Sequence, residues 1–149
     1  MSSVRWIWTP FAELSLVQLY DALLLRQAVF VVEQDCPYLD ADGDDPRCHH
    51  LLGYSAAGLD AYLRVYPPGD TRDEIVIGRV VTHQRVRRQG LGRRLMAEGQ
   101  ARAFAAWGEG PIWLSAQAYL LSFYQSLGYR VVGPGYDEDG IPHFPMRRP

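Results

Sequence analysis

The chain has 149 residues, of which 48% are hydrophobic and 21% charged, and its formal net charge is −2. This composition is ordinary for a globular domain, which at this length can bury a core without disulfide or metal staples. The lack of a basic surplus argues against a nucleic-acid binder or a binder of anionic membranes. No apolar run approaches the roughly 20 residues of a membrane span, and no signal peptide is recognisable. We therefore expect one cytoplasmic domain, residues 1–149, with Cys36 and Cys48 as reduced thiols.

The first half of the chain predicts a strand, a helix and a hairpin. Ser15 and Gln18 have the spacing of a capping box, and helically spaced leucines follow them. The segment after the helix contains proline, glycine and aspartates without periodicity, which is typical of a loop. The predicted elements are a strand over 4–8, a helix over 15–31, a loop over 33–48, and hairpin strands over 49–55 and 59–66.

The second half begins with residues 75–83, a β-branched and mostly apolar run that predicts a central strand covered on both faces. Gly78 interrupts this run, which indicates a bulge or a close backbone approach. The later elements are a helix over 90–106, a strand over 111–117, a helix over 118–128, and strands over 129–133 and 141–148. Prolines in the last strand restrict it to an edge or bulged position. The order of elements predicts an α/β fold with a central mixed sheet flanked by helices.

A turn reading RRQGLGRRLM joins the central strand to the next helix, at residues 87–96. The start of a helix presents unpaired N–H groups and a positive dipole end, which together attract phosphate. Gly90 and Gly92 remove side chains that would hold an anion away from the backbone, and the arginines add positive charge. The turn has neither the Lys-Ser/Thr of a P-loop nor the third glycine of a dinucleotide fingerprint. A glycine turn on an arginine-rich surface is the alternative reading.

The spacing R-x-x-G-x-G at 87–92 resembles the pyrophosphate-binding motif of the GNAT superfamily of N-acetyltransferases. Further segments resemble its ElaA-like branch, and they are FVVEQDCPYLDADGDD, HHLLGY, VIGRVV, LSAQAYLLSFYQSLGY and DGIPHFPM. The resemblance covers nearly the whole chain and implies a GNAT-like acyl-CoA N-acyltransferase fold with acetyl-CoA as cosubstrate. The cofactor-binding residues that it implies are Val80, Val81, Thr82, Arg87, Arg88, Gln89, Gly90, Leu91, Gly92 and Arg93.

The resemblance also implies that Tyr124 points at the sulfur of CoA and assists the leaving thiolate. Because a phenol is a weaker acid than a thiol, full proton transfer from an unperturbed tyrosine would be uphill by about 2 kcal/mol. Hydrogen bonding to the developing thiolate would be enough to help. The alternative is that Tyr124 is simply a core residue beside Phe123.

Amide formation needs a neutral amine, so a general base is expected near the acceptor. Glu33 is the first candidate because it enters the loop that is expected to border the acceptor site. His50 is the second, and on an extended strand it faces opposite to His49. Weaker candidates are His83, Gln117 and His143.

The sequence DADGDD at 40–45, followed by Cys48 and two histidines, resembles a metal site only superficially. It places glycine and the last acidic ligand wrongly for an EF-hand loop, and it has no C-x-x-C pair. We therefore expect no metal, and a solvated acidic loop that attracts a cationic amine.

Together these patterns predict an acetyl-CoA-dependent N-acetyltransferase that acts on a primary amine of a small molecule or peptide in a ternary complex. A non-catalytic, regulatory CoA-binding domain of the same family is the alternative. No nucleic-acid or membrane partner is expected, and the sequence leaves a homodimer open.

Overall fold

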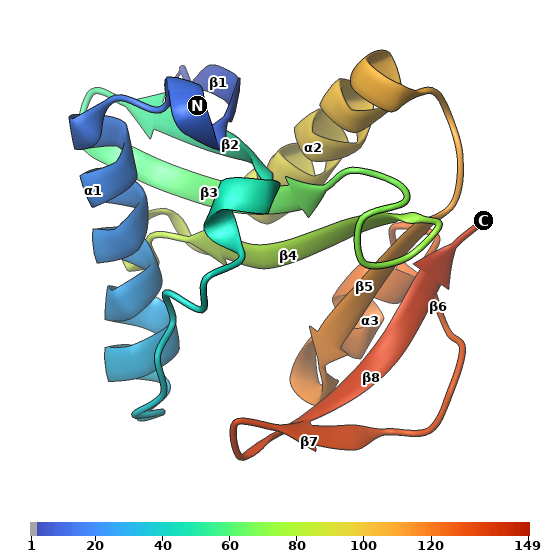
Figure 1. Cartoon of the computed structure of the whole chain (residues 1–149). Coiled ribbons are helices and arrows are strands. Elements are labelled where there is room, and N and C mark those ends of the chain that lie inside the picture. The colour runs from blue at the N-terminus through green and yellow to red at the C-terminus, as the bar shows by residue number, and fades with distance from the viewer. Residues whose placement is uncertain (1–2) are drawn as a thin grey trace.

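Residues 3–149, described by a computed structural model, form a sheet of eight strands with helices on both faces (Figure 1). The strands are β1 (Arg5–Pro10), β2 (His49–Ser55), β3 (Gly58–Tyr66), β4 (Ile75–Thr82), β5 (Ile112–Gln117), β6 (Arg130–Val131), β7 (Tyr136–Glu138) and β8 (Ile141–Arg148). The helices are α1 (Leu16–Arg26), α2 (Leu91–Trp107) and α3 (Leu121–Gln125), with a π-helix η2 (Gln27–Glu33). Short 3-10 turns are η1 (Phe11–Glu13), η3 (Asp45–Arg47), η4 (Gln84–Val86) and η5 (Ala118–Leu120). Within these residues no helix is long and apolar enough to cross a membrane.

The sheet follows the order β1-β2-β3-β4-β5-β8-β6, with β7 also paired to β8. Strands β4 and β5 run parallel, and α2 makes the crossover that a parallel pair requires. Only two residue pairs, Ile75↔Ile112 and Val76↔Trp113, join these strands at their beginnings. Beyond them β4 and β5 diverge, as Figure 1 shows. The mixed α/β fold expected from the sequence is confirmed, and its central strands separate where the candidate site lies.

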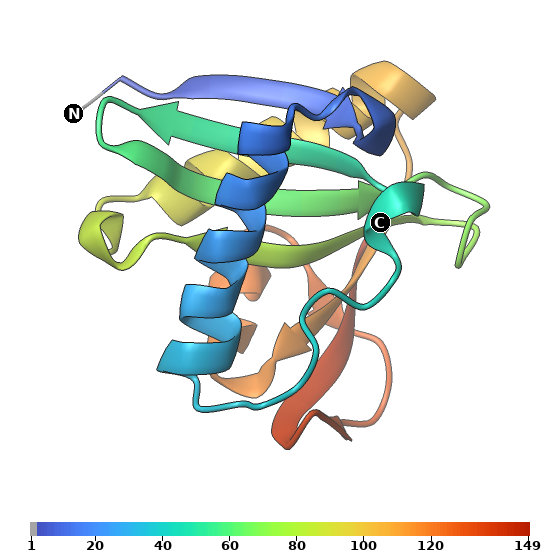
Figure 2. The same cartoon turned by 60° about the vertical axis from the view of Figure 1, so that its left-hand side comes forward.

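Helices cover both faces because the inner strands are apolar on both sides. Helix α1 lies across one face and α2 lies behind the other (Figure 2). Neighbouring residues of β3 serve the two layers, since Leu63 packs in the cluster that includes α2 and Tyr62 packs in the cluster that includes α1. Leu95 and Met96 of α2 are fully buried, and each such side chain contributes about 1.5–3 kcal/mol.

Helix α1 begins at the expected capping box. The Ser15 hydroxyl accepts a hydrogen bond from the Gln18 N–H, and the Gln18 side chain accepts one from the Ser15 N–H. The helical path continues beyond Arg26 as η2 and ends at Glu33. This extension places Glu33, the last residue of η2, near the region where β4 and β5 diverge.

The last strand differs from the prediction, because β8 is neither an edge strand nor a bulged one. It pairs with β5 on one side and with β6 and β7 on the other. The two prolines are tolerated for separate reasons. The carbonyl of Pro145 accepts from the Val132 N–H, so its main chain faces away from β5 and leaves that ladder intact. Pro142 lies beyond the last pair with β5, which is Gln117↔His143.

Candidate active site

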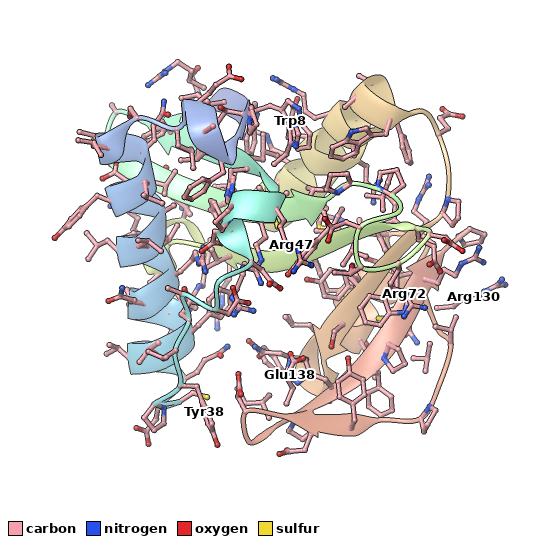
Figure 3. The ribbon with its side chains drawn as sticks, viewed as in Figure 1. Trp8, Tyr38, Arg47, Arg72, Arg130 and Glu138 are labelled. Atoms are coloured by element: carbon pink, nitrogen blue, oxygen red, sulfur yellow. The ribbon has the colours of Figure 1, made fainter. Side chains whose placement is uncertain are left out.

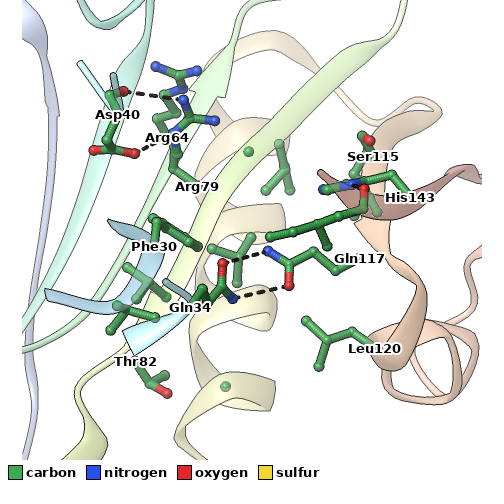
Figure 4. A pocket seen from close by; sticks show the side chains of 18 of the residues that line it. Phe30, Gln34, Asp40, Arg64, Arg79, Thr82, Ser115, Gln117, Leu120 and His143 are labelled. Carbon is green, nitrogen blue, oxygen red and sulfur yellow. Dashed lines mark hydrogen bonds and ion pairs between the residues drawn. The ribbon is translucent and has the colours of Figure 1, made fainter. Parts of the chain in front are cut away.

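A cavity of about 940 Å³ lies where β4 and β5 diverge. Its walls come from both strands, the 87–93 turn, α3, the end of η2 with the loop after it, and the β7–β8 hairpin. Figure 4 shows Arg79 and Phe30 on one side of this cavity and Ser115, Gln117 and His143 on the other. Segments that are far apart in the sequence therefore converge on a single space.

One wall of the cavity is a β-bulge in β4. The register between β3 and β4 shifts beside Gly78, so that Arg79 and Val80 together face Leu63. Arg79 has a positive φ of 51°. The irregularity expected at Gly78 is thus present one residue further along. A bulge leaves main-chain groups outside the ladder, and here they lie at the cavity wall.

The turn before α2 has the form of an anion site. Gly90 is the N-cap of α2 with φ 77°, and no side chain caps the helix. The first N–H groups of α2 therefore lack partners within the helix. A Cβ on Gly90 would meet nothing within 4 Å, so the space beside the turn is open. Backbone donors, open space and the arginines around them are what phosphate recognition requires.

The predicted cofactor-binding residues, except Gln89, all line this cavity. Leu91 and Val81 are only 6% and 4% exposed, because both residues pack in the core. Arg93 donates to the Ser126 hydroxyl at 3.1 Å. Nine of the ten residues that the resemblance implied thus lie along one cavity.

Tyr124 also lines the cavity, from α3. Its residue is 5% exposed, and its ring packs edge-on against Phe123 and Tyr129, with centroids 5.1 and 5.9 Å away. Burial raises the pKa of the Tyr124 hydroxyl, so that this group stays protonated and can donate a hydrogen bond. Tyr124 is therefore both a buried residue that packs beside Phe123 and a residue of the cavity wall.

Glu33 lines the cavity at the end of η2, where its carboxylate forms an ion pair with Arg87. Arg87 also donates to the Thr82 carbonyl, so the pair lies beside the glycine turn. The hydrogen bond from Arg87 lowers the pKa of Glu33. The Glu33 carboxylate is therefore paired with the guanidinium of Arg87 beside the turn. The role of Glu33 as a general base stays a prediction.

His50 does not reach the cavity, which corrects its place as a candidate base. His50 is 1% exposed. Its Nε2 lies 2.9 Å from the Asp45 carbonyl and its Nδ1 lies 2.6 Å from the Tyr62 hydroxyl. Because a carbonyl only accepts, Nε2 donates and Nδ1 accepts from Tyr62. Burial lowers the pKa of His50, and both nitrogens are engaged in the core.

The acidic loop is not a solvated field that attracts cations, which corrects the prediction for residues 40–45. Asp40 pairs with Arg26 at 2.7 Å and with Arg79 at 2.8 Å. Asp45 pairs with Arg26 at 2.8 Å and with Arg64 at 2.9 Å. The further pairs are Asp42 with Arg64 and Arg79, and Asp44 with Arg47. These arginines come from α1, β3, β4 and η3, and they neutralise the loop while fixing it beside the bulge.

Two polar pairs in the cavity are not predicted by the sequence patterns above. Gln34 and Gln117 exchange hydrogen bonds of 3.1 and 3.2 Å and so connect the loop after η2 to β5 across the cavity (Figure 4). His143 on β8 lies 3.2 Å from Glu138 on β7. From the sequence, Gln117 and His143 are weaker candidates for the base than Glu33 and His50. An Asp-Gly dipeptide at 139–140 is a strong hairpin pattern that could have predicted the second pair.

Comparison with known proteins identifies the class. Residues 68–148 match the family model described as an acetyltransferase (GNAT) domain. The chain belongs to the GNAT acetyltransferase family, whose general reaction is acetyl-CoA-dependent acetylation. Among its relatives is the protein ElaA of Escherichia coli K12, which is 44% identical over 147 residues, 97% of this chain and 96% of that protein. The resemblance to the ElaA-like branch is thereby confirmed.

Solved structures agree with this assignment. The crystal structure of Escherichia coli ElaA has 42% identity and a TM-score of 0.91, covering 99% of this chain and 100% of that one. An acyl-CoA N-acyltransferase from Pseudomonas aeruginosa has 44% identity and a TM-score of 0.94, with the same coverage. An aminoglycoside 6′-N-acetyltransferase complexed with coenzyme A is 16% identical, with a TM-score of 0.72 over 95% of each chain, and shows similarity of fold alone. The GNAT fold is confirmed, and the family supports acyltransferase activity.

Proposed function

We propose that this chain transfers an acetyl group from acetyl-CoA to a primary amine of a small molecule or peptide, in a direct ternary complex. The observation that carries the proposal is the convergence of the open glycine turn, the bulge in β4 and Tyr124 on one cavity. The uncapped start of α2 and the arginines around it suit the anionic part of a long thioester.

The residues present fit acetyl-CoA. The N–H groups at the start of α2 would hold the pyrophosphate, with Arg87, Arg88 and Arg93 around them. Val80 and Thr82 on the edge of β4 would line the pantetheine arm. When bound, acetyl-CoA supplies an activated acetyl thioester.

Two groups of the chain support acyl transfer chemistry. Main-chain N–H groups at the Arg79–Val80 bulge could stabilise negative charge that develops on the thioester oxygen. The hydroxyl of Tyr124 could donate to the leaving sulfur. Since burial raises the pKa of Tyr124, complete proton transfer from it is still less favourable than from an exposed phenol, and its contribution is hydrogen bonding.

A primary ammonium must lose a proton before it attacks, which costs about 4–5 kcal/mol at pH 7 for an amine of pKa about 10.4. Glu33 is one candidate for the acceptor of this proton. It would act only after Arg87 turned from its carboxylate toward the pyrophosphate, because the ion pair otherwise occupies it. Its proton transfer would therefore depend on cofactor binding.

A screen of amines with acetyl-CoA tests the function. The panel consists of polyamines, amino sugars, amino acids and peptides with free N-termini, and it follows thiol release together with product mass. We expect at least one amine to release thiol and gain one acetyl group in equal amounts. Tight CoA binding without transfer to any amine would instead support the non-catalytic CoA-binding alternative. A cytoplasmic location and a homodimer stay predictions, to be checked by cell fractionation and by sedimentation.

A further inference from the structure

Glu138 and His143 lie 3.2 Å apart in the β7–β8 hairpin, and both line the cavity. Figure 4 shows His143 on the side opposite Arg79 of the bulge. The hairpin turns at Asp139 and Gly140, whose φ values are 53° and 80°. The side chain of His143 is 8% exposed and that of Glu138 is 49% exposed. Figure 3 shows Glu138 extending from β7 toward the space between the hairpin and the loop after η2. One partner is thus fixed in the wall while the other is accessible from the cavity.

The hydrogen bonds of His143 indicate which of its two ring nitrogens carries a proton. Nδ1 lies 2.7 Å from the carbonyl of Ile141, which can only accept, so Nδ1 carries a proton. Nε2 lies 3.2 Å from a carboxylate oxygen of Glu138. In a neutral ring, Nε2 is a hydrogen-bond acceptor, and it faces the carboxylate of Glu138, which is also an acceptor. A favourable contact between Nε2 and this carboxylate therefore needs a proton or a cationic donor between them.

The surroundings favour a cation here over other parts of the cavity. The carboxylates of Asp40, Asp42 and Asp45 are matched by buried arginines, and Glu33 is matched by Arg87. Glu138 has no arginine partner within residues 3–149 and is paired only with His143.

The groups packed around the His143 ring are otherwise uncharged. Tyr136 on β7 stacks on the ring with centroids 6.1 Å apart, and its hydroxyl is hydrogen-bonded to Ser115 of β5. The β5 residue paired with His143 is Gln117. The titratable groups that face the ring are therefore Glu138 and Tyr136.

We propose that Glu138 and His143 form the subsite for the primary ammonium group of the acceptor, with Nε2 of His143 as the proton acceptor. This rests on the proposed acetyl transfer. The carboxylate of Glu138 and Nε2 both accept hydrogen bonds from the ammonium, and Nε2 then takes one proton. The resulting imidazolium donates to Ile141 and to Glu138, so that both of its N–H groups are satisfied.

Each acetyl transfer forms one carbon–nitrogen bond and breaks one carbon–sulfur bond. The amine nitrogen, now neutral, forms a bond to the thioester carbonyl carbon and the carbon–sulfur bond breaks. The electron pair of that bond leaves with sulfur, which takes the second proton lost by the nitrogen and becomes the thiol. His143 returns its proton to solvent. The sum is ammonium plus thioester giving amide, thiol and one proton.

Steady-state kinetics with the best amine of the screen test the subsite. Glu138→Gln keeps size and removes charge, and we expect the KM for the amine to rise about tenfold while the KM for acetyl-CoA stays within about twofold. His143→Gln is expected to lower kcat near pH 7 by about 100-fold, with partial recovery at high pH where free amine is abundant. Asp137→Asn, on the same strand but outside the cavity lining, is the matched control and should behave as wild type.

A binding measurement keeps the inference testable without turnover. The side-chain 1H–13C resonance of His143 in the whole protein is titrated at pH 7 with n-butylamine, and with n-butanol as a neutral probe of the same length. We expect a saturable shift with the amine alone, and loss of that shift in Glu138→Gln. Because Glu138 is exposed, this variant is expected to fold even if His143→Gln does not.

The outcomes separate the inference from the function on which it rests. If wild type acetylates amines but the Glu138→Gln kinetics and the His143→Gln profile match those of wild type, the subsite is wrong and acetyl transfer stands. If Glu33→Gln rather than His143→Gln changes the pH profile, the proton acceptor is Glu33 and the assignment to His143 is overturned. If n-butylamine and n-butanol shift His143 equally, ammonium recognition at this pair is excluded.

Discussion

Replacing Asp45 by asparagine tests whether the buried ion pairs hold the acidic loop in place. Oδ1 of Asp45 accepts from both Arg26 and Arg64, whose side chains are 1% and 4% exposed. Asparagine keeps this oxygen but removes the charge, so two charge-assisted hydrogen bonds become ordinary ones. At a loss of about 1–1.5 kcal/mol for each bond, the free energy of unfolding should fall by about 2–3 kcal/mol. For a chain of this size the melting temperature would fall by about 5–10 °C.

The pH dependence of this loss gives the same reasoning a second test. Burial tends to raise the pKa of Asp45, but its interactions with Arg26 and then Arg64 outweigh burial and lower it. A lowered folded-state pKa means that the stabilisation is complete above the unfolded value near 4 and is lost as pH falls through the folded value. The difference between wild type and Asp45→Asn should therefore shrink below about pH 4.

Urea unfolding at several pH values provides the measurement, and Asp70→Asn provides the control. Asp70 pairs with Arg47 at the surface, where the side chains are 27% and 45% exposed, so its replacement should cost less than about 1 kcal/mol. If both variants lose the same free energy of unfolding, the buried ion pairs of Asp45 do not hold the loop in place. The same conclusion follows if the free energy lost in Asp45→Asn does not change with pH.

Two further predictions concern the reaction. Tyr124→Phe should lower kcat while the KM for acetyl-CoA changes little, because the hydrogen bond of Tyr124 is made mainly in the transition state. Stopped-flow single-turnover experiments would measure the rate of the chemical step separately from product release. An unchanged single-turnover rate would return Tyr124 to a purely structural role. Glu33→Gln removes the carboxylate that competes for Arg87, so calorimetry should find CoA bound about two- to fivefold more tightly. With His143 as the proton acceptor, the pH–rate profile of this variant should match that of wild type. Weaker binding, or a profile that recovers only at high pH, would support Glu33 as the base instead.

Local patterns predicted most of the fold. The capping box at Ser15, the hairpin of β2 and β3 and the turn before α2 depend on residues a few positions apart, which sequence periodicity reports directly. The predicted helix over 118–128 was less regular than expected, with a 3-10 turn before the short α3, although Gly128 ends the segment at φ 94° as anticipated.

The acidic loop could not be understood from its own residues. Its aspartates look solvated in sequence, and their partners Arg26, Arg64 and Arg79 lie in three other elements. Only the tertiary fold brings these charges together, so local composition predicted the opposite electrostatic role. The position of β8 failed for a related reason, because the tolerance of Pro145 depends on which way its main chain faces within the sheet.

In the candidate site, too, local patterns predicted some residues, while others depend on the tertiary fold. The residues predicted to bind the cofactor lie in one strand and the turn after it, and nine of these ten residues line the cavity. The residues proposed for the acceptor side are Glu138, His143 and Glu33 at the end of η2, which belong to separate segments and share no motif. Single residues could be named there, but their partners could not.

The central claim is that the 87–92 turn holds the pyrophosphate of acetyl-CoA, and a calorimetric cycle tests it most directly. CoA and pantetheine, which lacks the nucleotide and its phosphates, are titrated into wild type and into Gly92→Val. A Cβ at Gly92 would lie 3.5 Å from the Phe123 ring, an ordinary contact that the fold should accept. Gly110→Val is the control, since a Cβ there meets nothing within 4 Å.

We predict that wild type and Gly110→Val bind CoA far more tightly than pantetheine, and that Gly92→Val loses most of this advantage while binding pantetheine as wild type does. An undiminished preference for CoA in a folded Gly92→Val protein would contradict the assignment of the turn.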